Sequence, residues 1–325
     1  GLLILIFLAI MIGNTAYEAG NISGAVLGLE TLFGKKLIPV FGFSLNLFSI
    51  VIGVIAGGLL WMGKYKIIER SLIVLVLLMS VSFLITAVVS GPPILNILKG
   101  LFSFTTPKGS ILSIIGLVGT TIVPYNLFLH TELVREKWSK KSDLSFAMKD
   151  MVIALILGGV ISMSVIITAA SVKTMQLEST ADLALGLEPL FGTFAKYFLA
   201  FGLFAAGITS TITAPLAAAY VVCGCMGWQA NLESYRFQRI WAIVILFGVL
   251  FSATGLKLIF IIQFAQITNG VLLPLIAAIL LWIMNKDSIL GSSKNNLGQN
   301  ILGILLVLIS IFLSFRSLWS VYKSL

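Results

Sequence analysis

Charged residues are scarce in this sequence of 325 residues: they make up 10% of the chain, against roughly 25% in soluble domains. There are only two cysteines and one histidine. The sequence also lacks a Gly-rich phosphate loop with its lysine, a His/Glu zinc spacing and a Ser-His-Asp set. Hydrophobic residues make up 59% of the chain, and the mean hydropathy is +1.10. This composition excludes an ordinary soluble domain and does not favour an enzyme or a bound cofactor.

The apolar residues come in blocks of about 20, the length that crosses about 30 Å of hydrocarbon as a helix. The expected fold class is therefore an all-α polytopic membrane protein. An apolar stretch at Ile94–Phe104 is too short to span and is expected to lie at the membrane interface. We predict nine transmembrane helices, at residues 1–33, 39–63, 68–91, 109–133, 149–171, 193–226, 237–253, 257–284 and 299–319.

Basic residues are unevenly shared between the loops on the two sides of these helices. One side carries twelve Lys and Arg; the other carries seven, plus Arg316 and Lys323 after the last helix. Because basic loops stay in the cytoplasm, the chain is expected to start at the cytoplasmic face and end outside. The net charge of +9 lies in these loops, so nucleic acid is not an expected partner. Short loops favour a bacterial inner membrane as the location.

Glu18 is an acidic residue near the middle of the first predicted helix, where a carboxylate is costly. It lies among other polar side chains, including Asn14 and Asn21. One interpretation is a neutral carboxylic acid that is hydrogen-bonded to a neighbouring helix. The other, which the polar neighbours favour, is a site that handles protons.

The fourth predicted helix contains Pro124, which lacks an amide proton and clashes with the carbonyl of Thr120 one turn earlier. Gly119 precedes this point. Because of this proline, we expect the helix to break at Thr120–Pro124. Breaks of this kind form the substrate sites of inverted-repeat transporters. A proline kink without a ligand is the alternative. His130 follows the break and is either a proton relay or a structural residue. The relay is considered because histidine is the side chain that ordinarily titrates nearest neutral pH.

The eighth predicted helix contains Gln263, Gln266 and Asn269, which are three residues apart and share a face. Pro274 follows. Three amides so close together indicate either a polar stripe packed against other helices or side chains that bind a substrate.

The residues of the fourth helix resemble the Nramp family of proton-coupled divalent-metal transporters. Where the family has Met-Pro-His-Asn-Leu-Tyr-Leu-His, residues 123–130 read Val-Pro-Tyr-Asn-Leu-Phe-Leu-His. The spacing of Gln266 and Pro274 also matches the family's tenth helix, and Glu18 lies where its third helix has an acidic residue. The resemblance implies an inverted-repeat fold of the leucine-transporter type, with the nine segments as family helices three to eleven. The family's first two helices are absent from this sequence.

The resemblance also implies roles for individual residues. The metal ligands would be the carbonyl of Thr120 and the side chain of Gln266, with Asn269 on the same face. Val123 takes the position of the metal-binding Met, so the thioether is missing. The proton path would include Glu18, His130 and Tyr125, the last of these in place of a family histidine.

The expected function is secondary-active transport of a divalent cation such as manganese or magnesium, by alternating access around the break. The metal would be the substrate, and the sequence leaves open whether protons are coupled to its transport and how many chains assemble. A same-fold transporter of a small organic substrate and a truncated, non-transporting membrane protein are the alternatives.

The chain is expected to form one transmembrane domain, with 1–91 as the remainder of the first repeat, 109–284 as the second and 299–319 as an extra helix.

Overall fold

The computed structural model confirms a helical membrane-type fold. Six of the described helices are long and apolar enough to cross a membrane, or seven if the bent pair α3–α4 counts as one span. Most of the fourth predicted helix lies outside the described part of the chain. The structure describes residues 2–40, 43–62, 66–103, 110, 113–114, 116–117, 123, 129–131, 134, 137–138, 140–171, 184–254 and 256–324.

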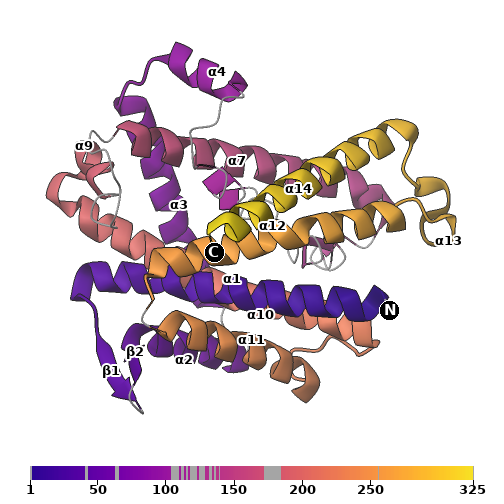
Figure 1. Cartoon of the computed structure of the whole chain (residues 1–325), viewed down its shortest axis with the longest axis horizontal. Coiled ribbons are helices and arrows are strands. Elements are labelled where there is room, and N and C mark those ends of the chain that lie inside the picture. The colour runs from indigo at the N-terminus through magenta and orange to yellow at the C-terminus, as the bar shows by residue number, and fades with distance from the viewer. Residues whose placement is uncertain are drawn as a thin grey trace.

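The elements follow one another as long helices joined by short connections (Figure 1). Short 3-10 turns precede α7, α10 and α14 at 141–143, 192–194 and 291–293. The helices and strands are α1 (Leu2–Phe33), β1 (Leu37–Val40), β2 (Phe43–Asn46), α2 (Leu47–Met62), α3 (Lys66–Val89), α4 (Ile94–Phe102), α7 (Leu144–Ser171), α9 (Glu188–Phe191), α10 (Ala195–Met226), α11 (Tyr235–Ala253), α12 (Leu258–Ile283), α13 (Asp287–Leu290) and α14 (Leu297–Ser324).

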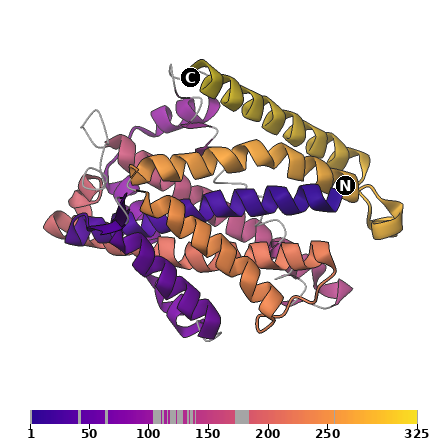
Figure 2. The same cartoon turned by 60° about the horizontal axis from the view of Figure 1, so that its bottom comes forward.

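Helix α1 lies at the centre of the bundle, in contact with α2, α10, α11 and α12 (Figures 1 and 2). Small residues allow these helices to approach closely. A Cβ atom on Gly28 of α1 would lie 2.5 Å from the carbonyl oxygen of Ala200 in α10, and one on Gly207 of α10 would collide with the backbone of Ala25. Backbones that touch in this way are the usual basis of helix packing in membranes.

The main hydrophobic core lies on one side of α1, where α2, α10 and α11 meet it. Ile22 of α1 and Ile52 of α2 are fully buried there, in the same cluster as Ile208 of α10 and Phe237 of α11. Packing of this kind fixes α1 in the bundle along much of its length.

The second predicted helix begins later than expected. The start of its range belongs to a two-stranded antiparallel hairpin in which Leu37 pairs with Asn46 and Val40 with Phe43, and the helix that follows, α2, starts at Leu47. The prediction was wrong here because hydropathy alone does not distinguish a short apolar strand from a helix.

The apolar stretch after the third predicted helix is helical, as α4. It is bent by 113° relative to α3, and none of its residues is buried. A short apolar helix turned away from a spanning helix is compatible with the predicted interfacial position, which stays a prediction.

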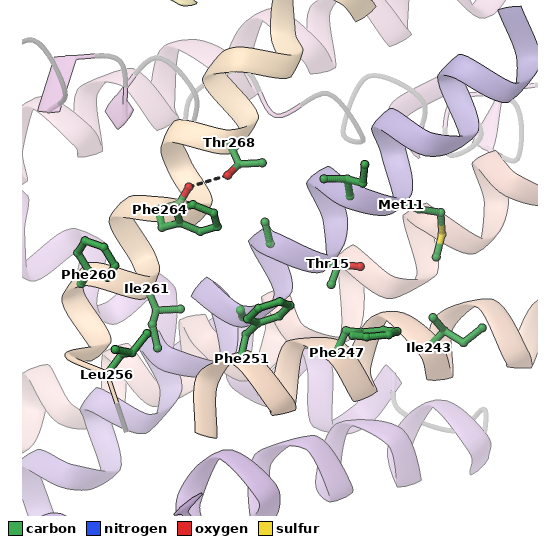
Figure 3. A pocket seen from close by; sticks show the side chains of 13 residues that line it. Met11, Thr15, Ile243, Phe247, Phe251, Leu256, Phe260, Ile261, Phe264 and Thr268 are labelled. Atoms are coloured by element: carbon green, nitrogen blue, oxygen red, sulfur yellow. Dashed lines mark hydrogen bonds between the residues drawn. The ribbon is translucent and has the colours of Figure 1, made fainter. Parts of the chain in front are cut away.

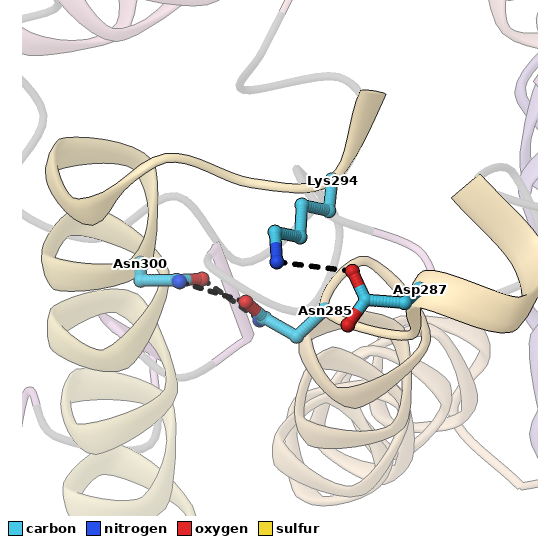
Figure 4. A network of polar contacts seen from close by, with 4 residues as sticks. All are labelled: Asn285, Asp287, Lys294 and Asn300. Carbon is cyan, nitrogen blue, oxygen red and sulfur yellow. Dashed lines mark hydrogen bonds and ion pairs between the residues drawn. The ribbon is translucent and has the colours of Figure 1, made fainter. Parts of the chain in front are cut away.

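Polar side chains hold the connection between α12 and α14 (Figure 4). Asn285 and Asn300 donate to each other's side-chain oxygens at 2.8 and 2.7 Å, and Lys294 pairs with Asp287 at 3.0 Å. The connection therefore fixes α14 beside α12.

Candidate functional site

The middle of α1 buries two polar side chains on one face. Asn14 and Glu18 are four residues apart, and their side chains are 1% and 0% exposed. Gly248 of α11 makes room for the carboxyl group, since a Cβ atom there would lie 2.5 Å from Cγ of Glu18. The sequence predicted Glu18 as a site residue but did not include Asn14.

One polar side-chain atom of each of these two residues is buried and unpaired among the described residues. Asn21 donates to Oε2 of Glu18 at 3.3 Å. Oε1 of Glu18 and Nδ2 of Asn14 have no hydrogen-bond partner among the residues that the structure describes. Leaving a buried polar atom unsatisfied costs about 1–3 kcal/mol. The middle of α1 therefore carries hydrogen-bonding capacity that the described protein groups do not use.

Another buried polar residue of the same helix is satisfied. The hydroxyl of Ser23 lies 3.1 Å from that of Ser252 in α11, which is itself 2.9 Å from the hydroxyl of Ser49 in α2. This chain of hydroxyl groups joins three helices. The unpaired atoms around Asn14 and Glu18 are thus a local feature and not a general property of α1.

Helix α12 brings a further buried amide to the same part of α1. Asn269 is 1% exposed, and its Nδ2 is unpaired within the described ranges. Its Oδ1 lies 3.3 Å from the point where a Cβ atom of Gly13 would be. Asn269 of α12 therefore lies beside Gly13 of α1, the residue that directly precedes Asn14.

Gln266 lies on the side of α12 that meets the fourth predicted helix, residues 109–133, which we call the fourth segment. Its Oε1 is 3.2 Å from the position that a Cβ atom of Gly116 would take. The predicted ligand Gln266 is therefore beside the segment that was expected to carry the helix break. This contact with Gly116 was not predicted, since a glycine in an apolar run gives little indication of what it touches.

Val123 is the one residue of the predicted break that the structure describes. It is 2% exposed and packs in a cluster with Ile10 of α1, Ala214 of α10 and Ile279 of α12. Val123 of the fourth predicted helix therefore packs against the central helices of the bundle. The remaining predicted residues of the break, Gly119, Thr120 and Pro124, lie outside the described residues, as does Tyr125, which was predicted for the proton path.

The two described residues of the predicted proton path differ in burial: the side chain of His130 is exposed, whereas Glu18 is fully buried. No group of three or more His, Cys, Asp or Glu side chains among the described residues could hold a metal ion. A metal ion bound by the described residues would therefore need ligands of other kinds, such as the amide oxygens of Gln266 and Asn269.

Pro274 does not interrupt α12, although it leaves the carbonyl of Gly270 without its usual donor. The hydroxyl of Ser314 in α14 lies 2.8 Å from that carbonyl and 2.8 Å from the carbonyl of Ser310 in its own helix, and its single hydrogen is shared between the two. An unpaired backbone group inside a membrane is costly, so this bond allows the helix to continue through the proline.

The family model described as natural resistance-associated macrophage protein-like (Nramp) matches residues 1–320. The chain belongs to the Nramp family. The resemblance seen in the sequence is thereby confirmed.

Curated Nramp relatives are similar over much of the chain. It is 26% identical to the divalent metal cation transporter MntH of Staphylococcus saprophyticus subsp. saprophyticus, over 90% of this chain and 70% of the relative. It is 29% identical to MntH of Bradyrhizobium diazoefficiens and 27% identical to the metal transporter nramp1 homolog of Dictyostelium discoideum, over 68% and 78% of this chain. The chain spans about half the length of these last two relatives, 51% of each.

Solved Nramp-type structures have the same fold. The crystal structure of a mutant of the Eremococcus coleocola manganese transporter matches 97% of this chain and 71% of its own, with a TM-score of 0.67 at 20% identity. The same transporter in complex with an aromatic bis-isothiourea substituted compound matches 98% of this chain and 72% of its own, with a TM-score of 0.68 at 20% identity. These matches confirm the expected leucine-transporter-type fold.

Proposed function

We propose that this chain forms the translocation core of a secondary-active transporter of divalent metal ions. The observation that carries the proposal is the set of buried, unpaired polar side chains on α1 and α12, Asn14, Glu18 and Asn269. Intramembrane polar groups of this kind usually line the path of a substrate or ion. The names of the similar MntH proteins supply the class of substrate.

The chemistry of the candidate ligands favours a hard cation. Gln266 and Asn269 offer amide oxygens, and Val123 offers no donor atom at all. Oxygen ligands suit magnesium, calcium or manganese, whereas thioether ligands favour softer metals. We therefore propose manganese or magnesium as the substrate, moved by alternating access of the fourth segment against α1 and α12.

Proton coupling is the second part of this proposal. Glu18 is the acidic side chain next to the unpaired amides, and its free Oε1 can hold or release a proton. His130, exposed at the other end of the proposed path, would exchange that proton with water. We further propose a bacterial plasma membrane as the location, with the start of the chain cytoplasmic and its end outside.

Influx of manganese, magnesium and cadmium into proteoliposomes made with the complete gene product tests the proposal. Removing a candidate ligand should reduce manganese or magnesium influx by about tenfold or more, equivalent to about 1.4 kcal/mol. We expect this loss for Gln266→Ala and Asn269→Ala. Gln263→Ala is the matched control, because Gln263 is on the same helix but exposed, and it should retain influx. Absence of influx for all three ions with folded wild-type protein would contradict the proposal, and saturable amino-acid uptake would replace it with an organic substrate.

Metal preference can be tested separately at Val123. Introducing a thioether with Val123→Met should raise the ratio of cadmium to manganese influx by about tenfold, or about 1.4 kcal/mol. Val244→Met is the control, because Val244 of α11 is buried in the same cluster and is not a candidate ligand. An unchanged ratio in Val123→Met, or an equal change in both variants, would show that Val123 does not face the ion.

A further inference from the structure

An apolar groove lies between α11 and α12 and has α1 as its floor (Figure 3). We call it the α11–α12 groove. Its volume is about 650 Å³. The two helices touch each other little along their length and are held together mainly through α1. The groove is lined by Met11, Ile12, Thr15, Ala16, Ala19, Ile243, Phe247, Phe251, Leu256, Phe260, Ile261, Phe264 and Thr268.

The surface of the groove is suited to hydrocarbon. Phe247 and Phe251 of α11 are 45% and 54% exposed, and Phe260 and Phe264 of α12 are 58% and 57% exposed. The hydroxyl of Thr268 donates to the carbonyl of Phe264 in its own helix at 2.9 Å. A polar ligand would therefore lose its hydration here and gain few hydrogen bonds.

The groove has about the length of one membrane leaflet. Both of its walls belong to helices long and apolar enough to span. From Ile243 to Phe251 α11 rises about 12 Å, close to the roughly 15 Å of half the hydrocarbon core. An extended acyl chain would therefore fill the groove while its head group lies at the membrane surface.

A positive charge marks one end of the groove. Lys257 follows the lining residue Leu256 and directly precedes the first turn of α12, which contains no acidic residue. Lys257 is exposed and makes no ion pair within the described ranges. The start of a helix adds a partial positive charge to that of the ammonium group, so this end attracts an anion.

We propose that the α11–α12 groove binds one phospholipid, with an acyl chain between the phenylalanines and the phosphate at Lys257. The lipid joins α11 to α12 where protein contacts between them are few. This proposal does not depend on which ion is transported.

Native mass spectrometry of the complete gene product, titrated with phosphatidylglycerol and phosphatidylcholine, tests the proposal. The wild-type protein should retain one lipid more tightly than all others. Ala16→Phe, which places a ring in the groove, should weaken that binding at least tenfold. Lys257→Gln should reduce the preference for phosphatidylglycerol severalfold and leave phosphatidylcholine bound.

Two matched controls accompany these variants. Ala154→Phe makes the same change on the exposed surface of α7, and Lys196→Gln removes an exposed lysine at the start of α10; both should retain the lipid as the wild type does. Leu256→Trp fills the groove from its exposed end and replaces Ala16→Phe if that variant does not fold. Equal retention of the lipid in groove and control variants would overturn the proposal. A second copy of the chain or a peptide bound in the groove instead of the lipid would overturn it too.

Discussion

Helices α7 and α10 are both long and apolar, but they are buried to very different extents. The most apolar window of α7 has a mean hydropathy of 2.5, and 11% of it is buried. The stretch Glu188–Met226, which contains α10, has a mean hydropathy of only 1.5, and 61% of its window is buried. In this protein the less hydrophobic helix forms the core.

The reason for the difference is the size of the side chains. Helix α10 presents small residues such as Ala200, Gly202 and Gly207 to its neighbours, and the last two would collide with them if they carried a Cβ atom. Gly158 and Gly159 of α7 have nothing within 4 Å of such an atom. Lipid is as apolar as leucine, so close packing and not hydrophobicity decides which helix is central in a membrane.

The largest effect expected from this comparison is at the contact of α10 with α1. Gly207→Leu would force a side chain into the backbone at Ala25, and overpacking against backbone should cost about 3 kcal/mol or more. Gly159→Leu in α7 should not destabilise the protein, because a Cβ atom there meets nothing within 4 Å and leucine favours a helix more than glycine does. Thermal unfolding of the purified protein in detergent measures both. Equal loss of stability in the two variants would refute the role of small residues in α10.

A smaller effect is expected at the polar centre of α1. Glu18→Gln keeps the size of the side chain and an oxygen for Asn21 but cannot release a proton. We expect it to fold and to reduce metal influx driven by an inward proton gradient by about tenfold, or about 1.4 kcal/mol. Glu30→Gln, at the half-buried end of the same helix, is the control and should leave influx unchanged. Normal influx in Glu18→Gln, with its dependence on the gradient intact, would exclude Glu18 from the proton path.

The smallest effect is expected for Ser314 in α14, a helix that resembles α7 in its low burial. Ser314→Ala removes the donor to the carbonyl of Gly270 and should destabilise the protein by about 0.6–1.7 kcal/mol, the range of hydrogen bonds between membrane helices. Ser310→Ala removes only a bond to Val307 within the same helix and should have less effect. If chemical unfolding shows the two variants to be equally stable, α14 does not support α12 at its proline.

Much of the fold could be predicted from the sequence, because the length of an apolar run reports directly on a spanning helix. The predicted ranges 1–33, 193–226 and 257–284 lie within a few residues of α1, α10 and α12. The hairpin of β1 and β2 was missed because most of its residues are apolar, like those of the helix that follows. Which helices form the core could not be predicted by hydropathy, since burial and hydropathy run in opposite directions here.

The candidate site was predicted in part. Glu18 and Asn269 were expected from their polarity inside apolar helices, and both are fully or almost fully buried. Asn14 was missed as a site residue, although its spacing of four residues from Glu18 puts it on the same face. The contact of Gln266 with Gly116 joins residues far apart in the chain, and no local pattern in a single sequence reports such a contact.

The central position of α1 has a consequence for how the protein is made. Its main partner α10 begins at Ala195, whereas α1 ends at Phe33. At a synthesis rate of about 5–20 residues per second, α1 emerges roughly 8–32 seconds before α10 begins to be made. During that interval Glu18 lacks its contact with Gly248 of α11, and Gly13, next to Asn14, lacks its contact with Asn269 of α12. The polar part of α1 is therefore completed only after the later helices have been made.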